Sequence, residues 1–290
     1  MPVADDYQTV RPAFHRVKHA MKLAVSNIAW PADQDAAVAR LLKSLGVGGI
    51  EVAPTKLFPK PLEATPADIT AVRHFWELHG IEIVAAQSLL FGRPDLTLFD
   101  SEEARRETHA YLAHLIQVCA KLGAQSLVFG SPKNRRLGTT PRDEAFRTAV
   151  EFFDDLADIA QAEGTCIVFE ANPPQYGADF VTTAGEAIDL VSEVNHPGFR
   201  LHLDTACMTL ARDPLPATFA AFPLLRHFHV SAPNLEAPSR ADGVDHAAFA
   251  EQLRTCGYEG WVSLEMREAT PFALEALADA VRFVKEQYEI

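Results

Sequence analysis

Four residues whose side chains bind metal ions or move protons close short apolar runs of the sequence. These residues, with their runs, are Glu170 (CIVFE), Asp204 (RLHLD), His229 (RHFHV) and Glu265 (WVSLE). An apolar run of this length is typical of a buried strand, and a carboxylate or imidazole is costly to bury alone. Four such groups at strand ends therefore predict one shared site, most simply a site for a divalent metal ion.

Spacing and side-chain alternation both support a single site. The four residues are separated by 34, 25 and 36 residues, about one strand plus one helix each time. Neighbouring side chains point to opposite faces of a strand, so in every run the apolar residues take one face and the polar residue takes the other. A lone strand-end acid is often a helix cap, and a lone inward histidine is often a core residue. Agreement of four separate strands favours the metal site.

Strand-like runs alternate with helical patterns eight times along the chain. The strands are expected at 22–27, 49–53, 81–87, 125–129, 166–171, 200–205, 227–231 and 261–266, and the clearest helices at 34–44, 66–79, 102–122, 143–162 and 272–288. Thr65, Ser101 and Asp245 are expected helix N-caps. Eight units in about 250 residues predict an α/β fold, a (β/α)8 TIM barrel in a single domain. An open doubly wound sheet would favour a glycine-rich turn after its first strand, and 26–29 reads SNIA.

Composition and charge limit the domain organisation, the cellular compartment and the kinds of partner that we expect. The 290 residues are 48% hydrophobic, and the formal net charge of −13 argues against nucleic-acid binding, which needs a basic surface. We interpret residues 1–20 as a poorly ordered extension and 21–290 as the catalytic barrel. Neither an apolar span for a membrane nor an export signal is apparent. The cysteines show no paired motif, so we expect reduced thiols and a cytoplasmic protein; they are Cys119, Cys166, Cys207 and Cys256.

At these residues the chain resembles the xylose-isomerase-like barrel superfamily. The resemblance covers about 21–290, and its motifs are FEANP at 169–173, HLDTACM at 202–208, HFHVSAP at 227–233 and VSLEM at 262–266. The superfamily includes sugar and sugar-phosphate isomerases and epimerases, hydroxypyruvate isomerase, inosose dehydratase and the DNA-binding endonuclease IV. The motifs are most similar to the ketose 3-epimerase branch. Cys207 and the net charge of −13 argue against an endonuclease.

The resemblance implies one divalent metal ion bound by Glu170, Asp204, His229 and Glu265. Three carboxylates and one imidazole favour Mn²⁺, Mg²⁺ or Co²⁺, with Zn²⁺ a further candidate. Glu170 and Glu265 would remove and return a proton beside a substrate carbonyl, through a metal-stabilised enediolate. This implies an isomerase or epimerase of a free, phosphorylated or acidic sugar, in a chain that forms a homodimer or homotetramer. The alternatives are a metal-dependent dehydratase of a keto-cyclitol or keto-sugar and a catalytically silent sugar-binding barrel, although two opposed bases speak against the silent barrel.

The sugar-contacting positions depart from the epimerase pattern. Cys207, Leu235 and Tyr176 stand where that branch commonly has a histidine, an arginine and a glutamate. An epimerase acting on a free ketose is therefore a weaker expectation than the barrel and the metal. In this position Cys207 would be a small spacer, a weak substrate contact or a reactive thiol.

Other polar residues on the same rim are candidate substrate contacts. They are Gln87, Lys133, Arg135, Asn172, Cys207 and Arg267. Lys133, Arg135 and Arg136 either clamp an anionic group or form a solvated loop. Gln87 and Asn172 either bind sugar hydroxyls or tie down loops, and Arg267 either binds substrate or pairs with Glu268. His202 and His227, one layer deeper, either support the metal ligands or pack in the core.

Overall fold

Eight parallel strands close into a barrel, in sequence order, in the computed structural model of this chain, which describes residues 21–290. The strands are β1 (Lys22–Ser26), β2 (Gly49–Val52), β3 (Glu82–Ala86), β4 (Ser126–Phe129), β5 (Ile167–Glu170), β6 (Phe199–Asp204), β7 (Leu225–Val230) and β8 (Trp261–Leu264). The predicted TIM barrel is confirmed, and each predicted strand range overlaps one observed strand. The predicted extension at 1–20 lies outside the described residues.

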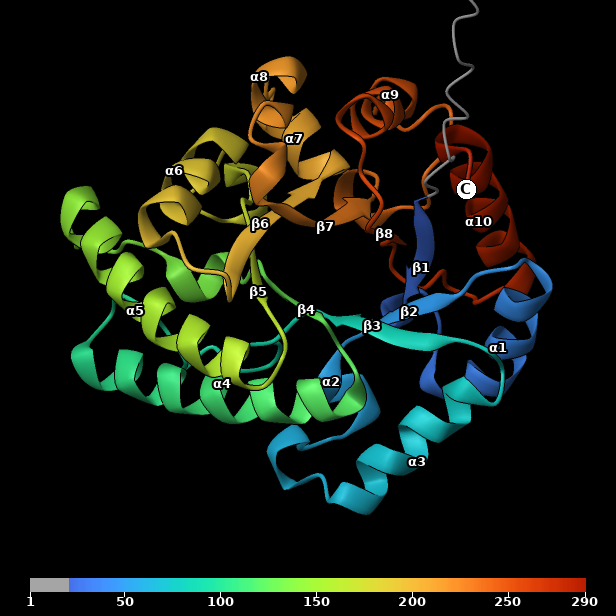
Figure 1. Ribbon diagram of the computed structural model, residues 1–290, viewed down its shortest axis with the longest axis horizontal. Helices are drawn as coiled ribbons and strands as arrows, with labels where there is room; N and C mark the ends of the chain where they lie inside the picture. The colour runs from blue at the N-terminus through green and yellow to red at the C-terminus, as the bar shows by residue number, and fades with distance from the viewer. Residues whose placement is uncertain (1–20) are drawn as a thin grey trace, which may run out of the picture.

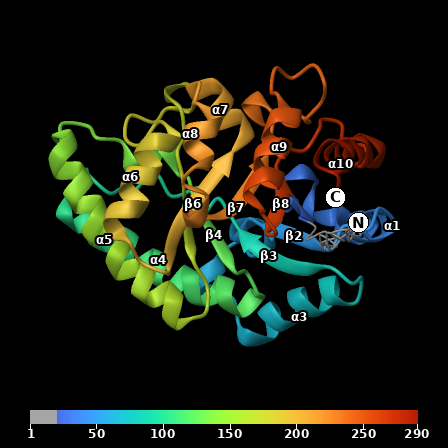
Figure 2. The same cartoon turned by 45° about the horizontal axis from the view of Figure 1, so that its top comes forward.

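Helices form the outer layer around the strands (Figure 1), and they stay outside the ring of strands in the turned view of Figure 2. They are α1 (Asp35–Ser44), α2 (Pro54–Leu57), α3 (Pro66–Glu77), α4 (Glu102–Leu122), α5 (Arg142–Ala162), α6 (Ala184–Val194), α7 (Thr205–Ala211), α8 (Leu215–Phe219), α9 (His246–Cys256) and α10 (Leu274–Tyr288). Thr65, Ser101 and Asp245 accept hydrogen bonds from backbone N–H groups of the first turns, as predicted for N-caps. Between residues 21 and 290 no helix is long and apolar enough to cross a membrane.

The main core lies between the strands and the helical layer. On one side of the molecule it is built from aromatic rings: Phe153 of α5 stacks on Phe199 at 4.8 Å between ring centroids and meets Phe129 and Phe169 edge-on at 5.0 and 5.3 Å. All four rings are almost completely buried. Because Phe169 faces the helices, the next residue, Glu170, faces the barrel axis, as alternation predicts.

Strand register brings the polar strand ends to one level. Asp204 of β6 is paired with His229 of β7, and Glu170 of β5 is paired with His202 of β6. His229 is in turn paired with Ser263 of β8, two residues before Glu265. The carboxyl ends of β5, β6, β7 and β8 therefore present their polar side chains together at one mouth of the barrel, the end at which TIM-barrel active sites lie.

Candidate metal centre and active site

The four residues singled out by the sequence converge in space. One ligand atom from each of Glu170, Asp204, His229 and Glu265 lies within 4.8 Å of the others. His229 Nδ1 is 3.4 Å from Glu265 Oε2 and 3.9 Å from Glu170 Oε1. The side chains of Glu170 and Glu265 are 13% and 12% exposed, whereas Asp204 and His229 are buried. The two glutamates thus face the opening, and the aspartate and histidine form the floor.

Asp204 is held in place by two donors. The backbone N–H of Cys207 donates to Asp204 Oδ1 at 2.6 Å, so that the aspartate is also the N-cap of α7. The Ser231 hydroxyl donates to Oδ2 at 2.5 Å. The carboxylate therefore has one fixed orientation, although each oxygen keeps a further lone pair for a ligand.

His229 is oriented by a buried glutamate that the sequence analysis missed. Glu51 of β2 is fully buried, and its Oε2 lies 2.8 Å from His229 Nε2 and 3.3 Å from His227 Nε2. With Nε2 bonded to Glu51, His229 presents Nδ1 to the other three residues of the site. A carboxylate behind a ligating histidine is a common arrangement in metal sites, because it fixes the tautomer and the ring orientation. The signal in the sequence was an acidic residue inside the apolar run GIEVA at 49–53.

The crowded carboxylates have strongly perturbed pKa values. Burial, with Asp204 and Glu265 close by, raises the pKa of Glu170 to about 8. Burial also raises the pKa of Glu265, although the neighbouring His229 opposes that effect. Burial by itself would lower the pKa of His229, but Glu51 and Glu265 outweigh it and hold the value well above the usual range. The carboxylates thus disfavour one another in their charged forms, and a bound cation would relieve that repulsion.

The residues fit a divalent metal ion. His229 Nδ1 is buried and has no hydrogen-bond partner among the described residues, so that a ring nitrogen is left free on the side of the carboxylates. Three carboxylates and one imidazole form a mixed oxygen and nitrogen set with no thiolate, which suits hard or borderline ions such as Mn²⁺, Mg²⁺ or Co²⁺. The unbonded nitrogen and the donor set are both compatible with a divalent metal ion.

Glycine at position 130 makes room for the site. Gly130 follows β4, and a Cβ atom built there would collide with Glu170 Oε2 and lie 3.2 Å from Asn172 Oδ1. A side chain at this position would push the Glu170 carboxylate away from its partners. The close approach of β4 to the glutamate therefore requires glycine.

A cavity of about 390 Å³ opens over Glu170, Asp204 and Glu265; we call it the catalytic cavity. Its lining consists of Pro132, Glu170, Asn172, Tyr176, Asp204, Ala206, Cys207, Ser231, Asn234, Leu235 and Glu265. All three positions that depart from the epimerase pattern are among them. The Tyr176 hydroxyl accepts a hydrogen bond from the Asn234 backbone N–H at 3.0 Å, which links the loops after β5 and β7.

Two of the predicted substrate contacts lie in this cavity. Asn172 donates to Glu170 Oε2 at 2.9 Å and lies 3.7 Å from the sulfur of Cys207. Burial, with Asp204 and Glu170 next to it, raises the pKa of the Cys207 thiol well above the usual range. A thiol that stays protonated is a poor nucleophile, so the structure favours the spacer or the weak contact over the reactive thiol.

Arg135 and Gln87 make their hydrogen bonds within the protein. Arg135 is fully buried and donates to the backbone carbonyls of Gly130, Phe180, Val181 and Glu170 and to Asn172 Oδ1. Its guanidinium is thus occupied by the protein and has no free donor for a substrate. Gln87 is 3% exposed, donates to the Ser26 hydroxyl and does not line the catalytic cavity.

Lys133 and Arg267 lie on the surface near the rim. Lys133 lines a neighbouring cavity and has no ion pair within residues 21–290. Arg267 pairs with Glu236 at 3.0 Å, and Glu268 pairs instead with Lys56 at 3.6 Å. The expected pair between Arg267 and Glu268 is therefore wrong, because the two side chains turn to partners on different loops.

The two deeper histidines differ in their surroundings. His227 bonds to Glu51, as a supporting residue would. His202 lies edge-on to His229 at 4.1 Å between ring centroids, and neither of its ring nitrogens has a hydrogen-bond partner in the described part of the chain. Burial, with His229 and His227 nearby, lowers the pKa of His202 well below its usual value.

The chain is similar to several known proteins. A D-psicose 3-epimerase from Ruminiclostridium cellulolyticum is 24% identical over 260 residues, which cover 86% of this chain and 83% of that protein. The structure of a D-psicose 3-epimerase in the presence of D-fructose has a TM-score of 0.76 at 20% identity and covers 92% of this chain and 99% of its own. The structure of a 3-keto-D-glucoside 4-epimerase from E. coli also has a TM-score of 0.76 at 20% identity, and it covers 92% of this chain and 99% of its own.

At these identities the two solved structures show a shared fold. The model of the xylose isomerase-like TIM barrel family matches residues 39–287, which is most of the chain and includes all four converging residues. The chain belongs to the xylose isomerase-like TIM barrel family.

Proposed function

We propose that the protein is a divalent-metal-dependent epimerase or isomerase of a neutral keto sugar. The observation that carries the proposal is the pair Glu170 and Glu265, which open on one cavity and share His229 between them. Two carboxyl groups beside one substrate can remove a proton from one side and return it from another. The similar proteins named as sugar epimerases support this class of reaction.

The residues have distinct tasks in such a reaction. Glu170, Asp204, His229 and Glu265 would hold the ion, and Glu51 keeps His229 in the ligating tautomer. A bound divalent ion supplies a Lewis acid that stabilises negative charge developing on a substrate oxygen. Of the two glutamates, one takes the proton from the carbon next to the carbonyl and the other delivers a proton. Delivery to the opposite face inverts that carbon, and delivery to the neighbouring carbon moves the carbonyl.

Charge at the rim supports a neutral substrate rather than a phosphorylated or acidic one. Of the three cations expected to form an anion clamp, Arg135 is buried and Arg136 lies 3.9 Å from Asp179. Only Lys133 remains without an ion pair in the described structure. A lone exposed lysine lacks the paired, forked donors with which proteins usually hold phosphate or carboxylate.

Proton exchange with solvent tests the proposal. The protein, loaded with Mn²⁺, would be incubated in D₂O with D-fructose, D-tagatose and methyl 3-keto-D-glucoside, and deuterium at the carbon next to the carbonyl followed by NMR. We expect exchange with at least one sugar, and a product that retains all its oxygens. Loss of water would indicate a dehydratase instead. Sugar binding without any exchange would indicate a binding protein and reject the proposal.

Glu265→Gln is the variant that tests the assigned base. The amide cannot accept the proton, so we expect exchange to fall by about a hundredfold or more, with an unchanged far-UV circular dichroism spectrum. Glu268→Gln is the matched control, because that glutamate is three residues away and pairs with Lys56 at the surface. Equal exchange in the two variants would show that Glu265 is not part of the acid and base pair.

A further inference from the structure

Two more cavities continue the catalytic cavity along the rim of the barrel. The first, of about 360 Å³, lies at the carboxyl ends of β3 and β4; we call it the bridging cavity. The second, of about 440 Å³, lies between the loops after β2 and β3 and the helix α4; we call it the outer cavity. Each volume falls in the range of roughly 300–1,000 Å³ that is typical of small-molecule sites.

The three cavities share walls. Pro132 lines both the catalytic and the bridging cavity, and Phe91, Gly92 and Arg93 line both the bridging and the outer cavity. One groove can therefore run from the four converging residues, past the loops after β4 and β3, to the loop after β2. A ligand in it would be longer than one sugar ring.

The bridging cavity has two serines in an unusual backbone conformation. Ser88 follows β3 and Ser131 follows β4, with φ angles of 56° and 41°. The left-handed region is unfavourable for residues other than glycine, asparagine and aspartate, and residues held there cluster at functional sites. Both serines line the cavity and are partly exposed. Two serines thus lie along the middle part of the groove.

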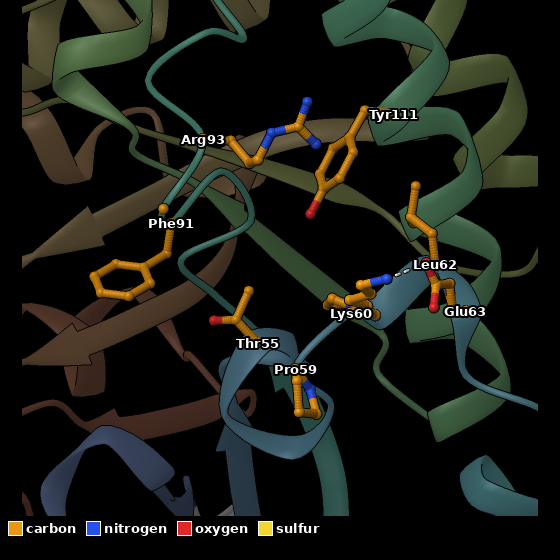
Figure 3. A pocket seen from close by; sticks show the side chains of 10 residues that line it. Thr55, Pro59, Lys60, Leu62, Glu63, Phe91, Arg93 and Tyr111 are labelled. Atoms are coloured by element: carbon orange, nitrogen blue, oxygen red, sulfur yellow. Dashed lines mark hydrogen bonds and ion pairs between the residues drawn. The ribbon is translucent and has the colours of Figure 1, made fainter.

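Phe91 stands where the bridging and outer cavities meet. Its side chain is 71% exposed, which is unusual for a phenylalanine. Figure 3 shows Phe91 projecting at one end of the outer cavity, on the side opposite Tyr111, with Lys60 and Leu62 across from it. An exposed aromatic ring in a groove offers a flat apolar surface to the C–H face of a sugar ring, and sugar hydroxyls can still reach water.

The charged groups of the outer cavity are already paired. Arg93 binds Asp95 through two nitrogens, at 3.0 and 2.6 Å, and covers the Tyr111 ring at 4.9 Å. Lys60 pairs with Glu63 at 2.9 Å. With these pairs made, the groove favours a neutral ligand with hydroxyl groups over an anion.

We propose that this groove binds a keto sugar that carries a second sugar ring, with the reacting ring at Glu170 and Glu265 and the second ring on Phe91. The inference rests on the proposed function, and it narrows the substrate class to disaccharides that contain a keto sugar. It also fits Cys207, Leu235 and Tyr176, which replace a histidine, an arginine and a glutamate of the epimerase pattern by less polar side chains. Contacts to a remote, unreactive part of a substrate can supply the missing binding energy and raise the rate of the chemical step.

Matched pairs of sugars test the proposal. Deuterium exchange is measured for D-fructose against isomaltulose, a disaccharide whose fructose unit has a free C3 hydroxyl, and for methyl 3-keto-D-glucoside against 3-ketotrehalose. We expect kcat/KM to be at least about tenfold higher for the disaccharide in one of the pairs. A monosaccharide that reacts as well as its disaccharide in both pairs would overturn the proposal.

The variant Phe91→Ala tests the contribution of the groove separately from that of the four converging residues. We expect it to reduce kcat/KM for the preferred disaccharide about tenfold more than for the matching monosaccharide, by loss of ring contact. Leu78→Ala is the control, because Leu78 is 65% exposed at the end of α3 and lines none of the three cavities. Equal losses for both sugars would contradict a role of Phe91 in holding the second ring.

A binding measurement distinguishes failure of this inference from failure of the proposed function. Isomaltulose, 3-ketotrehalose and the matching monosaccharide of each are titrated into the wild-type protein and Phe91→Ala by calorimetry. If no sugar exchanges deuterium but one of the two disaccharides binds and Phe91→Ala weakens it, the proposed function is wrong and the groove stands. If sugars exchange but neither disaccharide binds more tightly than its monosaccharide, the groove is wrong and the proposed function stands. If no sugar exchanges deuterium and neither disaccharide binds, both the groove and the proposed function are wrong.

Discussion

His229 connects the surface of the site to the interior of the barrel. One nitrogen faces Glu170 and Glu265, and the other is bonded to Glu51, 178 positions away in the sequence. The quartet could be predicted because each member closes an apolar run of its own. The role of Glu51 could not, since it depends on barrel closure, which brings β2 opposite β7.

Glu51→Gln tests this support of the metal ligand. An amide in place of the carboxylate removes the charge behind His229 and loosens its tautomer, so we expect Mn²⁺ affinity to fall about 10- to 100-fold. Calorimetric titration measures it, with thermal unfolding to show that the variant is folded. Glu82→Gln, at an exposed position at the start of β3, is the control. Unchanged affinity in folded Glu51→Gln would show that the carboxylate does not act on the metal site.

Arg135 connects several elements of the fold, because its hydrogen bonds join the ends of β4 and β5 to the segment at 180–181. Its buried guanidinium donates to the carbonyls of Gly130 and Glu170 and to Asn172 Oδ1. The sequence analysis predicted that this basic loop lies at the same end of the barrel as the four converging residues. It did not reveal which of the cations turns inward, because that choice depends on carbonyl groups contributed by three separate segments.

Arg135→Met should therefore destabilise the barrel. It leaves several buried carbonyl groups without donors, and we expect the free energy of unfolding to fall by about 3 kcal/mol or more. Lys133→Met, two residues away on the same turn and exposed, should change it by less than about 0.5 kcal/mol. Chemical denaturation of both variants measures the difference. Equal stability of the two would contradict a structural role for Arg135.

At the scale of the whole molecule, sequence periodicity predicted the fold but not the groove. The barrel follows from eight repeats of strand and helix, which are local patterns. The groove depends on how the loops after β2, β3 and β4 fold against one another, and Phe91 carries no sequence signal that distinguishes it from a core residue.

The stabilisation of the fold by a bound metal ion should increase with pH. The pKa of Glu170 is about 8 in the folded protein, against 4.5 for an ordinary glutamate. In the metal-free protein this difference contributes to the free energy of unfolding. The contribution is full below pH 4.5 and is lost as the pH rises through 8. A metal ion must displace the proton of Glu170, which becomes easier in the same interval. We therefore expect saturating Mg²⁺ to raise Tm more at pH 8 than at pH 6, as measured by calorimetry. An equal or smaller rise at pH 8 would contradict this charge balance.

Titration with Mn²⁺ tests most directly whether the four residues form a metal centre. Free Mn²⁺ is followed by electron paramagnetic resonance during titration of the metal-free wild-type protein, of Asp204→Asn and of Asp154→Asn, a control at an exposed position on α5. We predict one tightly bound ion per chain in the wild type and in Asp154→Asn, and binding weakened by about a hundredfold or more in Asp204→Asn. Equal binding in all three proteins, or none in the wild type, would contradict the metal centre.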